Sequence, residues 1–199
     1  KWIMEMDHGN GIECLPSELF YECFDYLDPP DIYRAFYNLN LRLNTIIDGA
    51  IFPHLNLTKL NKGNQIQNLT KSISAHHVLS LNIAAGNVVV LVNTCVLNKF
   101  SQLQALSISS VSNSVSFKCL IEQLPKLGQL KSLEIDRCDF GTTPMRAESL
   151  KIIFSLSTLK HLSLLDDYHF LLDDDDPFSG CVHLETLTIS LICFSSVYR

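Results

Sequence analysis

The sequence predicts an α-helical hairpin followed by an irregular α/β solenoid shaped like a horseshoe. Residues 15–47 contain two segments with helical spacing of apolar side chains, separated by Asp28-Pro29-Pro30-Asp31. From Val78 onward the phrase L-x-x-L-x-L occurs five times, at starts 25 to 29 residues apart. The chain has 199 residues and is 47% hydrophobic, which is enough to bury a core.

The hairpin follows from apolar spacing and from the prolines. In the first segment Leu19, Cys23 and Leu27 recur every four residues, as on one face of a helix. Consecutive prolines remove two backbone donors, so the first helix has to end before Pro29. Asp28 suits the N-cap of the second helix, whose apolar stripe runs to the end of the segment. Two helices of this length bury too little against each other, so the rest of the chain or a partner has to cover them.

The segment after the hairpin reads as a linker with a weak first repeat. Residues 51–77 are rich in Asn, Lys and Ser. Leu55 and Leu57 stand 26 residues before Leu81 and Ile83, which indicates a degenerate first strand. The expected organisation is a helical domain at 12–50, a linker and degenerate repeat at 51–77, and repeats at 78–199.

The repeated phrase is typical of leucine-rich repeats, in which a short strand points spaced aliphatic side chains inward. One copy has the longer form, with Cys138 at the turn after the strand. The segments between strands have helical spacing and belong on the outer face. The last repeat has an apolar edge and no polar cap, so we leave open that the chain is truncated at its C-terminus. The five copies are Val78/Leu81/Ile83, Leu103/Leu106/Ile108, Leu130/Leu133/Ile135, Leu159/Leu162/Leu164 and Leu184/Leu187/Ile189.

Residues 15–47 resemble the F-box motif, which opens L-P-x-E-L and continues with I-F-x-x-L and D-L. A hairpin directly followed by leucine-rich repeats is also the domain order of F-box proteins with such repeats. The resemblance implies a substrate-recognition adaptor that docks the adaptor Skp1 and, through it, a cullin-RING ubiquitin ligase. The implied Skp1-binding residues are Leu15, Pro16, Glu18, Leu19, Cys23, Phe24, Leu27, Asp31, Ile32, Phe36 and Leu39.

The other partner would be an unidentified protein substrate on the concave strand face. Alternation along each strand sends Leu106 and Ile108 inward and the residues between them outward. This outward surface is small and polar, which predicts modest affinity. The candidate substrate-binding residues are Ser107, Ser132, Glu134, Asp136, His161, Ser163, Thr186 and Thr188.

The main alternative is a non-catalytic leucine-rich-repeat scaffold whose hairpin is only a folding cap. An enzyme is not expected, because the eight glycines form no nucleotide-binding or nucleophile-elbow motif. The dispersed histidines show no metal-ligand spacing, so no metal or other cofactor is predicted. Four consecutive aspartates, Asp173 to Asp176, lack the alternation of a calcium loop and indicate a solvated insertion.

Charge and composition narrow the partners and the compartment. The formal net charge of −6 argues against nucleic acid. The most apolar window, Leu79 to Leu97, is interrupted by polar residues, so no membrane span is expected. The first ten residues carry acidic side chains where a signal peptide would have a basic region and an apolar run, so no signal peptide is expected. The seven cysteines are scattered singly, which favours a cytoplasmic and/or nuclear protein with reduced thiols. Cys23 and Cys138 are expected to be buried.

Overall fold

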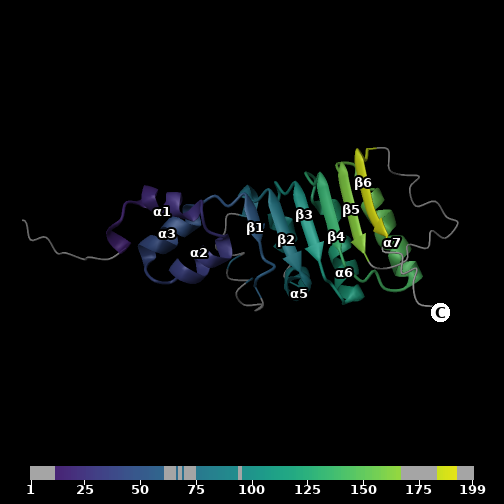
Figure 1. Cartoon of the computed structure of the whole chain (residues 1–199), viewed down its shortest axis with the longest axis horizontal. Helices are drawn as coiled ribbons and strands as arrows, with labels where there is room; N and C mark the ends of the chain where they lie inside the picture. Colours follow the sequence, from purple (N-terminus) through teal and green to yellow (C-terminus); the bar gives the residue numbers. More distant parts are fainter. Residues whose placement is uncertain are drawn as a thin grey trace, which may run out of the picture.

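The computed structural model describes residues 12–60, 66, 69, 75–93, 96–166 and 183–191. Three helices lie at one end of an elongated molecule, and the strands of a sheet follow from that end in chain order (Figure 1). The helices at this end are α1 (Ser17–Phe24), α2 (Pro29–Phe36) and α3 (Leu41–Gly49), preceded by the 3-10 turn η1 (Ile12–Cys14).

An aromatic cluster holds the three helices together. Phe20 and Phe24 of α1 are buried, and their ring centroids lie 6.2 Å apart. Phe36 of α2 packs edge-on against Phe20, with ring centroids 6.2 Å apart, and at a tilt of 49° against Phe24, with centroids 5.7 Å apart. The Arg42 guanidinium of α3 lies 5.9 Å from the centroid of the Phe20 ring, a cation–π arrangement.

The second helix is shorter than the sequence predicts, and the two-helix hairpin is therefore wrong. The helix ends at Phe36, because Asn38 adopts a left-handed conformation with φ of 63° and donates its backbone N–H to Asn44 Oδ1 at 2.8 Å. A new helix then begins with Asn40 as N-cap, whose Oδ1 accepts a hydrogen bond from Leu43 N at 2.8 Å. The helical spacing of apolar residues continues from α2 into α3, so the sequence pattern does not reveal the break between them.

The helical end is joined to the sheet at α2. Asp28 precedes α2, as expected of its N-cap, but its side chain makes no capping bond. Its Oδ2 instead accepts a hydrogen bond from Lys59 Nζ at 2.6 Å, which raises the pKa of Lys59. Lys59 follows β1, and α2 also contacts that strand directly. The first strand and the helices therefore form one packed unit.

The sheet has six parallel strands in the order β1-β2-β3-β4-β5-β6. They are β1 (His54–Asn56), β2 (Ser80–Ala84), β3 (Ala105–Ser109), β4 (Ser132–Asp136), β5 (His161–Asp166) and β6 (Thr186–Leu191). All five repeated phrases therefore contain strands, and a short strand is present at the expected degenerate repeat as β1, which includes Leu55 and ends one residue before Leu57. The register pairs equivalent phrase positions, Leu106 with Leu133 and Ile108 with Ile135.

Helices interleave with the strands on the aliphatic face of the sheet. They are α5 (Ala85–Asn93), α6 (Ser114–Ile121) and α7 (Thr143–Phe154), with short 3-10 turns η2 (Ala75–His77), η3 (Val96–Lys99) and η4 (Leu124–Lys126). Phe117 of α6 and Ile153 of α7 are fully buried in the same core as the strand leucines. Asn87 is buried in α5, where it accepts a hydrogen bond from Ala84 N and donates one to Leu60 O.

The expected fold class, a helical hairpin followed by a leucine-rich-repeat solenoid, is overturned by this arrangement. The hydrogen-bonded ladders join every strand into one continuous parallel sheet with interleaved helices, which is an α/β architecture and not a solenoid. The prediction was correct on where each strand lies. It failed on assembly, because a repeated phrase specifies one strand at a time, and the pairing of strands is a tertiary property.

Candidate functional site

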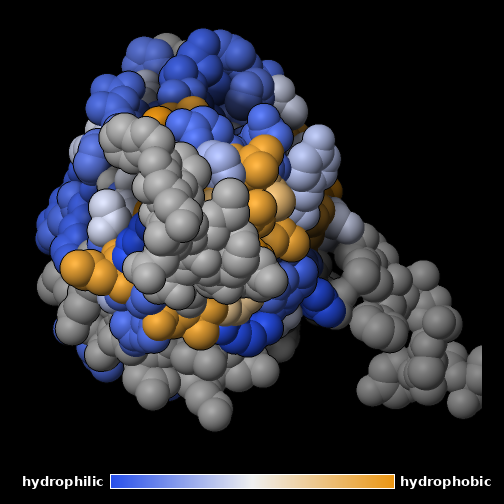
Figure 2. Space-filling view, turned by 90° about the vertical axis from the view of Figure 1, so that its left-hand side faces the viewer, coloured by the Kyte–Doolittle hydropathy of each residue, from blue (hydrophilic) through white to orange (hydrophobic). Residues whose placement is uncertain are grey.

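Exposed apolar side chains are concentrated at the helical end. Among the described residues, eight of the thirteen large hydrophobic side chains that are exposed lie between residues 12 and 41. Figure 2 looks at this end and shows hydrophobic side chains at the surface between hydrophilic ones. We call the set the helical-end surface: Ile12, Leu15, Leu19, Tyr21, Tyr26, Leu27, Leu39 and Leu41.

Helix α1 explains how this surface arises, because it has two neighbouring apolar rows. One row, Phe20 and Phe24, faces the core and is at most 5% exposed. The other contains Leu19 and Cys23, one turn apart on α1, and Leu19 is 41% exposed. Leu27 extends it one turn beyond the helix and is 42% exposed. Only the row of Phe20 and Phe24 packs into the core, and the row of Leu19 and Cys23 is left at the surface.

Helix α3 holds the start of this surface in place. Arg42 Nη2 donates a hydrogen bond to the carbonyl oxygen of Leu15 at 2.5 Å, across 27 residues of sequence. Leu39 and Leu41, on either side of the Asn40 cap, are 58% and 82% exposed. The break between α2 and α3 thus leaves Leu39 and Leu41 at the surface beside the Asn40 cap.

The predicted Skp1-binding residues occupy three kinds of position. Phe24 and Ile32 are buried in the helical core and in this structure present no surface to a partner. Phe36 is half-buried against that core, and Asp31 is half-buried and paired with Arg34 at 3.1 Å. The remaining seven are exposed: Leu15, Pro16, Glu18, Leu19, Cys23, Leu27 and Leu39.

Two expectations about cysteines have opposite outcomes. Cys138 is fully buried, and its thiol lies 3.4 Å from the carbonyl oxygen of Asp136 and 3.6 Å from that of Ile108, which confirms the prediction. Cys23 was also expected to be buried and is exposed, so that prediction is wrong. Its row of α1 is apolar but faces away from the core.

The candidate substrate-binding residues line up across the open face of the sheet. We call this face the polar sheet face. One row joins Ser107, Glu134, Ser163 and Thr188 on four successive strands. A second row joins Ser132, His161 and Thr186, and Asp136 lies two residues beyond Glu134 on β4. The side chains are half-buried or exposed, in contrast to the aliphatic ladder behind them. The sheet brings together all eight predicted residues.

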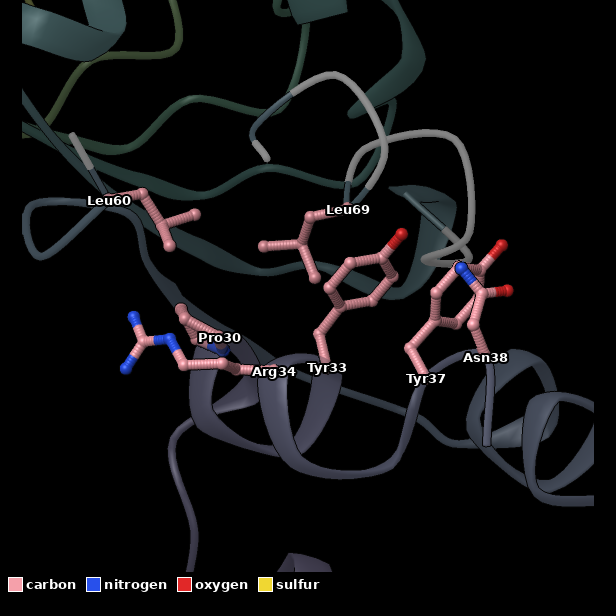
Figure 3. A pocket seen from close by; sticks show the side chains of 7 residues that line it. All are labelled: Pro30, Tyr33, Arg34, Tyr37, Asn38, Leu60 and Leu69. Carbon is pink, nitrogen blue, oxygen red and sulfur yellow. The ribbon is translucent and has the colours of Figure 1, made fainter. Parts of the chain in front are cut away.

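A cavity of about 260 Å³ lies between α2 and the residues after β1 (Figure 3). Tyr33 and Tyr37 line it with stacked rings whose centroids are 4.1 Å apart, and Leu60 and Leu69 lie across from them. Ligand pockets for drug-sized molecules usually measure about 300 to 1,000 Å³. The lining combines apolar groups of Pro30, Leu60 and Leu69 with two tyrosines, the Arg34 guanidinium and the Asn38 amide.

A second cavity, which sequence reasoning missed, lies where strands β4 to β6 begin. It measures about 360 Å³, and Lys131, Lys160, His183 and Glu185 are among the residues that line it. Each of these lysines directly precedes a strand, as Glu185 does, so they hold equivalent positions in the repeated phrases, but only the pairing of the strands brings them side by side. We call it the rim cavity.

Neither a metal-binding cluster nor a membrane-spanning helix occurs in the described part of the chain. No three His, Cys, Asp or Glu side chains gather there as a metal site would need. The acidic run Asp173 to Asp176 lies outside the described residues. In the same described ranges, no helix has both the length and the apolar character that crossing a bilayer requires. No family model matches this chain, and no curated protein matches it.

Proposed function

We propose that this protein is a non-catalytic substrate receptor of a Skp1-cullin-F-box ubiquitin ligase. The helical end docks Skp1, and the polar sheet face receives the target protein. Ubiquitin transfer is carried out by other subunits of the ligase, in the cytoplasm or the nucleus. The observation that carries this proposal is the helical-end surface, which coincides with the segment that resembles the F-box motif.

The placement of apolar side chains favours docking over a simple cap. A helical unit that served only to cover the first strand would bury its apolar residues against β1. Here α2 already does so, with Ile32 fully buried. Leu19 and Leu27 are not part of that buried contact in full, since about two fifths of each is exposed. A second apolar surface beside a complete core indicates a protein contact.

The polar sheet face suits the target because it is open and built from small residues. Ser107 and Ser163 flank the exposed Glu134, so a partner backbone can approach this row closely. Strand side chains stand roughly perpendicular to the sheet, so neighbouring hydroxyls present a flat polar surface. Few aromatic anchors are available there, and affinity for the target through this face should be modest.

The decisive experiment is co-purification of the full chain with Skp1, comparing the wild type with Leu19→Ala/Leu27→Ala. Truncating interface anchors usually costs about 2 kcal/mol or more, roughly thirtyfold in affinity. The double variant should therefore lose Skp1 in a stringent wash while its melting curve stays close to that of the wild type. Val115→Ala is the matched control, because Val115 on α6 is 64% exposed and lies outside the helical-end surface.

The outcomes separate the two functions. No association of the wild-type chain with Skp1 would refute the adaptor role and favour a scaffold whose helices only cap the sheet. Equal retention of Skp1 by the wild type and the double variant would refute this surface as the docking site. For the target, Ser107→Arg/Ser163→Arg should keep Skp1 bound and abolish ubiquitination of proteins that the wild-type complex modifies.

A further inference from the structure

The rim cavity is lined by charged and hydroxyl-bearing side chains that have no role in the proposed function. Lys131, Lys160 and Glu185 stand in successive positions along the edge where β4, β5 and β6 begin. Backbone bonds set this alignment: Lys160 N donates to Lys131 O at 2.8 Å, and Glu185 N donates to Lys160 O at 2.8 Å. Lys160 therefore starts about one strand spacing, roughly 4.8 Å, from Lys131 on one side and from Glu185 on the other.

Charge along this edge is unevenly compensated. Lys160 Nζ donates to Glu185 Oε1 at 2.5 Å, and this bond lowers the pKa of the Glu185 carboxyl. Lys131 Nζ instead donates to the neutral amide oxygen of Gln104 at 3.1 Å. Among the described residues that line the rim cavity there are two ammonium groups and one carboxylate, and Lys131 is the ammonium group that this carboxylate does not pair.

Uncharged donors surround the same cavity. Ser157 and Thr158 line it with hydroxyl groups, and His183 adds an imidazole. These side chains are exposed, so they reach the cavity from its margin without the cost of burial. Ammonium groups with hydroxyl and imidazole donors around one concavity are the chemistry that binds a phosphate-type anion.

We propose that the rim cavity binds a phosphate dianion, held by Lys131 and Lys160 with hydroxyl donation from Ser157 and Thr158. Glu185 acts as an internal competitor, because its carboxylate occupies Lys160 when the cavity is empty. The anion is either free phosphate or the phosphate group of a small monoester. This site is separate from the helical-end surface, and its existence does not depend on Skp1 docking.

The test is a titration of the full-length, isotope-labelled chain with potassium phosphate, followed by amide NMR shifts at constant ionic strength set with potassium chloride. Shifts should saturate at the amides of Thr158, Lys160 and Glu185. Lys131→Gln should weaken binding about two- to fivefold, the range expected for an exposed charge interaction. Glu185→Gln should tighten binding by a similar factor, because it frees Lys160.

Tighter phosphate binding by Glu185→Gln distinguishes an anion site from an ion pair that only stabilises the fold. Glu148→Gln is the matched control: it releases Lys118 from the same kind of pair, but on α6 and α7, and should leave phosphate affinity unchanged. A second titration with glycerol 2-phosphate distinguishes free phosphate from a monoester. Shifts that chloride reproduces equally, or Glu185→Gln without tighter binding, would overturn the proposal.

Discussion

Replacing Ile135 by alanine tests which face of the sheet is the core. Ile135 is 1% exposed and lies in register between Ile108 and Leu164 on the neighbouring strands. The substitution removes three carbon groups at about 0.8 kcal/mol each, or about 2.4 kcal/mol of burial. The cavity that the shorter side chain leaves costs a further ~24 cal/mol per Å³ of its volume. Together the two terms should lower the free energy of unfolding by about 3 to 4 kcal/mol.

The matched control is Glu134→Ala, one residue earlier on the same strand and on the opposite face. An exposed substitution of this kind usually changes stability by no more than about 0.5 kcal/mol. Urea unfolding followed by circular dichroism measures both. Ile135→Val, with an expected loss of about 0.5 to 1.5 kcal/mol, keeps the comparison measurable if Ile135→Ala does not fold.

Three outcomes would refute this reasoning about the two faces. A loss below about 1 kcal/mol for Ile135→Ala falls outside the range for a buried isoleucine and would show that its face is not the core. A loss above about 2 kcal/mol for Glu134→Ala, typical of buried positions, would show that the polar sheet face is covered. Equal losses of about 3 kcal/mol for both would mean that the strand is buried on both sides, which would also remove the proposed surface for a target protein.

Other substitutions test local features. Asn40→Ala should cost about 1 kcal/mol, because α3 loses the side-chain acceptor for Leu43 N, and an unchanged urea midpoint would contradict this cap. Ser149→Ala should gain about 1 kcal/mol, since within the described residues its buried hydroxyl has no partner and alanine favours helices. A lower melting temperature would show that the hydroxyl is satisfied. Gly141→Ala should cost about 1 to 2 kcal/mol, because φ is 78° and the new Cβ would lie 2.9 Å from a carbon of α6. Gly128→Ala, where an added Cβ meets nothing within 4 Å, should be close to neutral in the same melting experiment.

The helical end shows how far apolar periodicity can be trusted. It correctly indicates that Phe20 and Phe24 share a face of α1, and that Leu19 and Cys23 share another. It cannot tell which of two adjacent apolar rows is buried, because that depends on what packs against the helix. Phe36 of α2 and Arg42 of α3 cover the phenylalanine row, so Cys23 is left at the surface.

The sequence by itself determined where the strands lie, which residues of each strand are aliphatic, and that the first helix ends before Pro29. These are local properties, since alternation, spacing and a missing backbone donor act within a few residues. Only the tertiary structure decided that the strands join one parallel sheet, that Asn38 and Asn40 split the second helix, and that Lys131 and Lys160 share a cavity. The joined sheet and the shared cavity depend on hydrogen bonds between residues far apart in the chain, which a repeated phrase does not encode. The split of the second helix rests on bonds within a few residues, Asn38 to Asn44 and Asn40 to Leu43, and the apolar spacing that continues across it hid this signal.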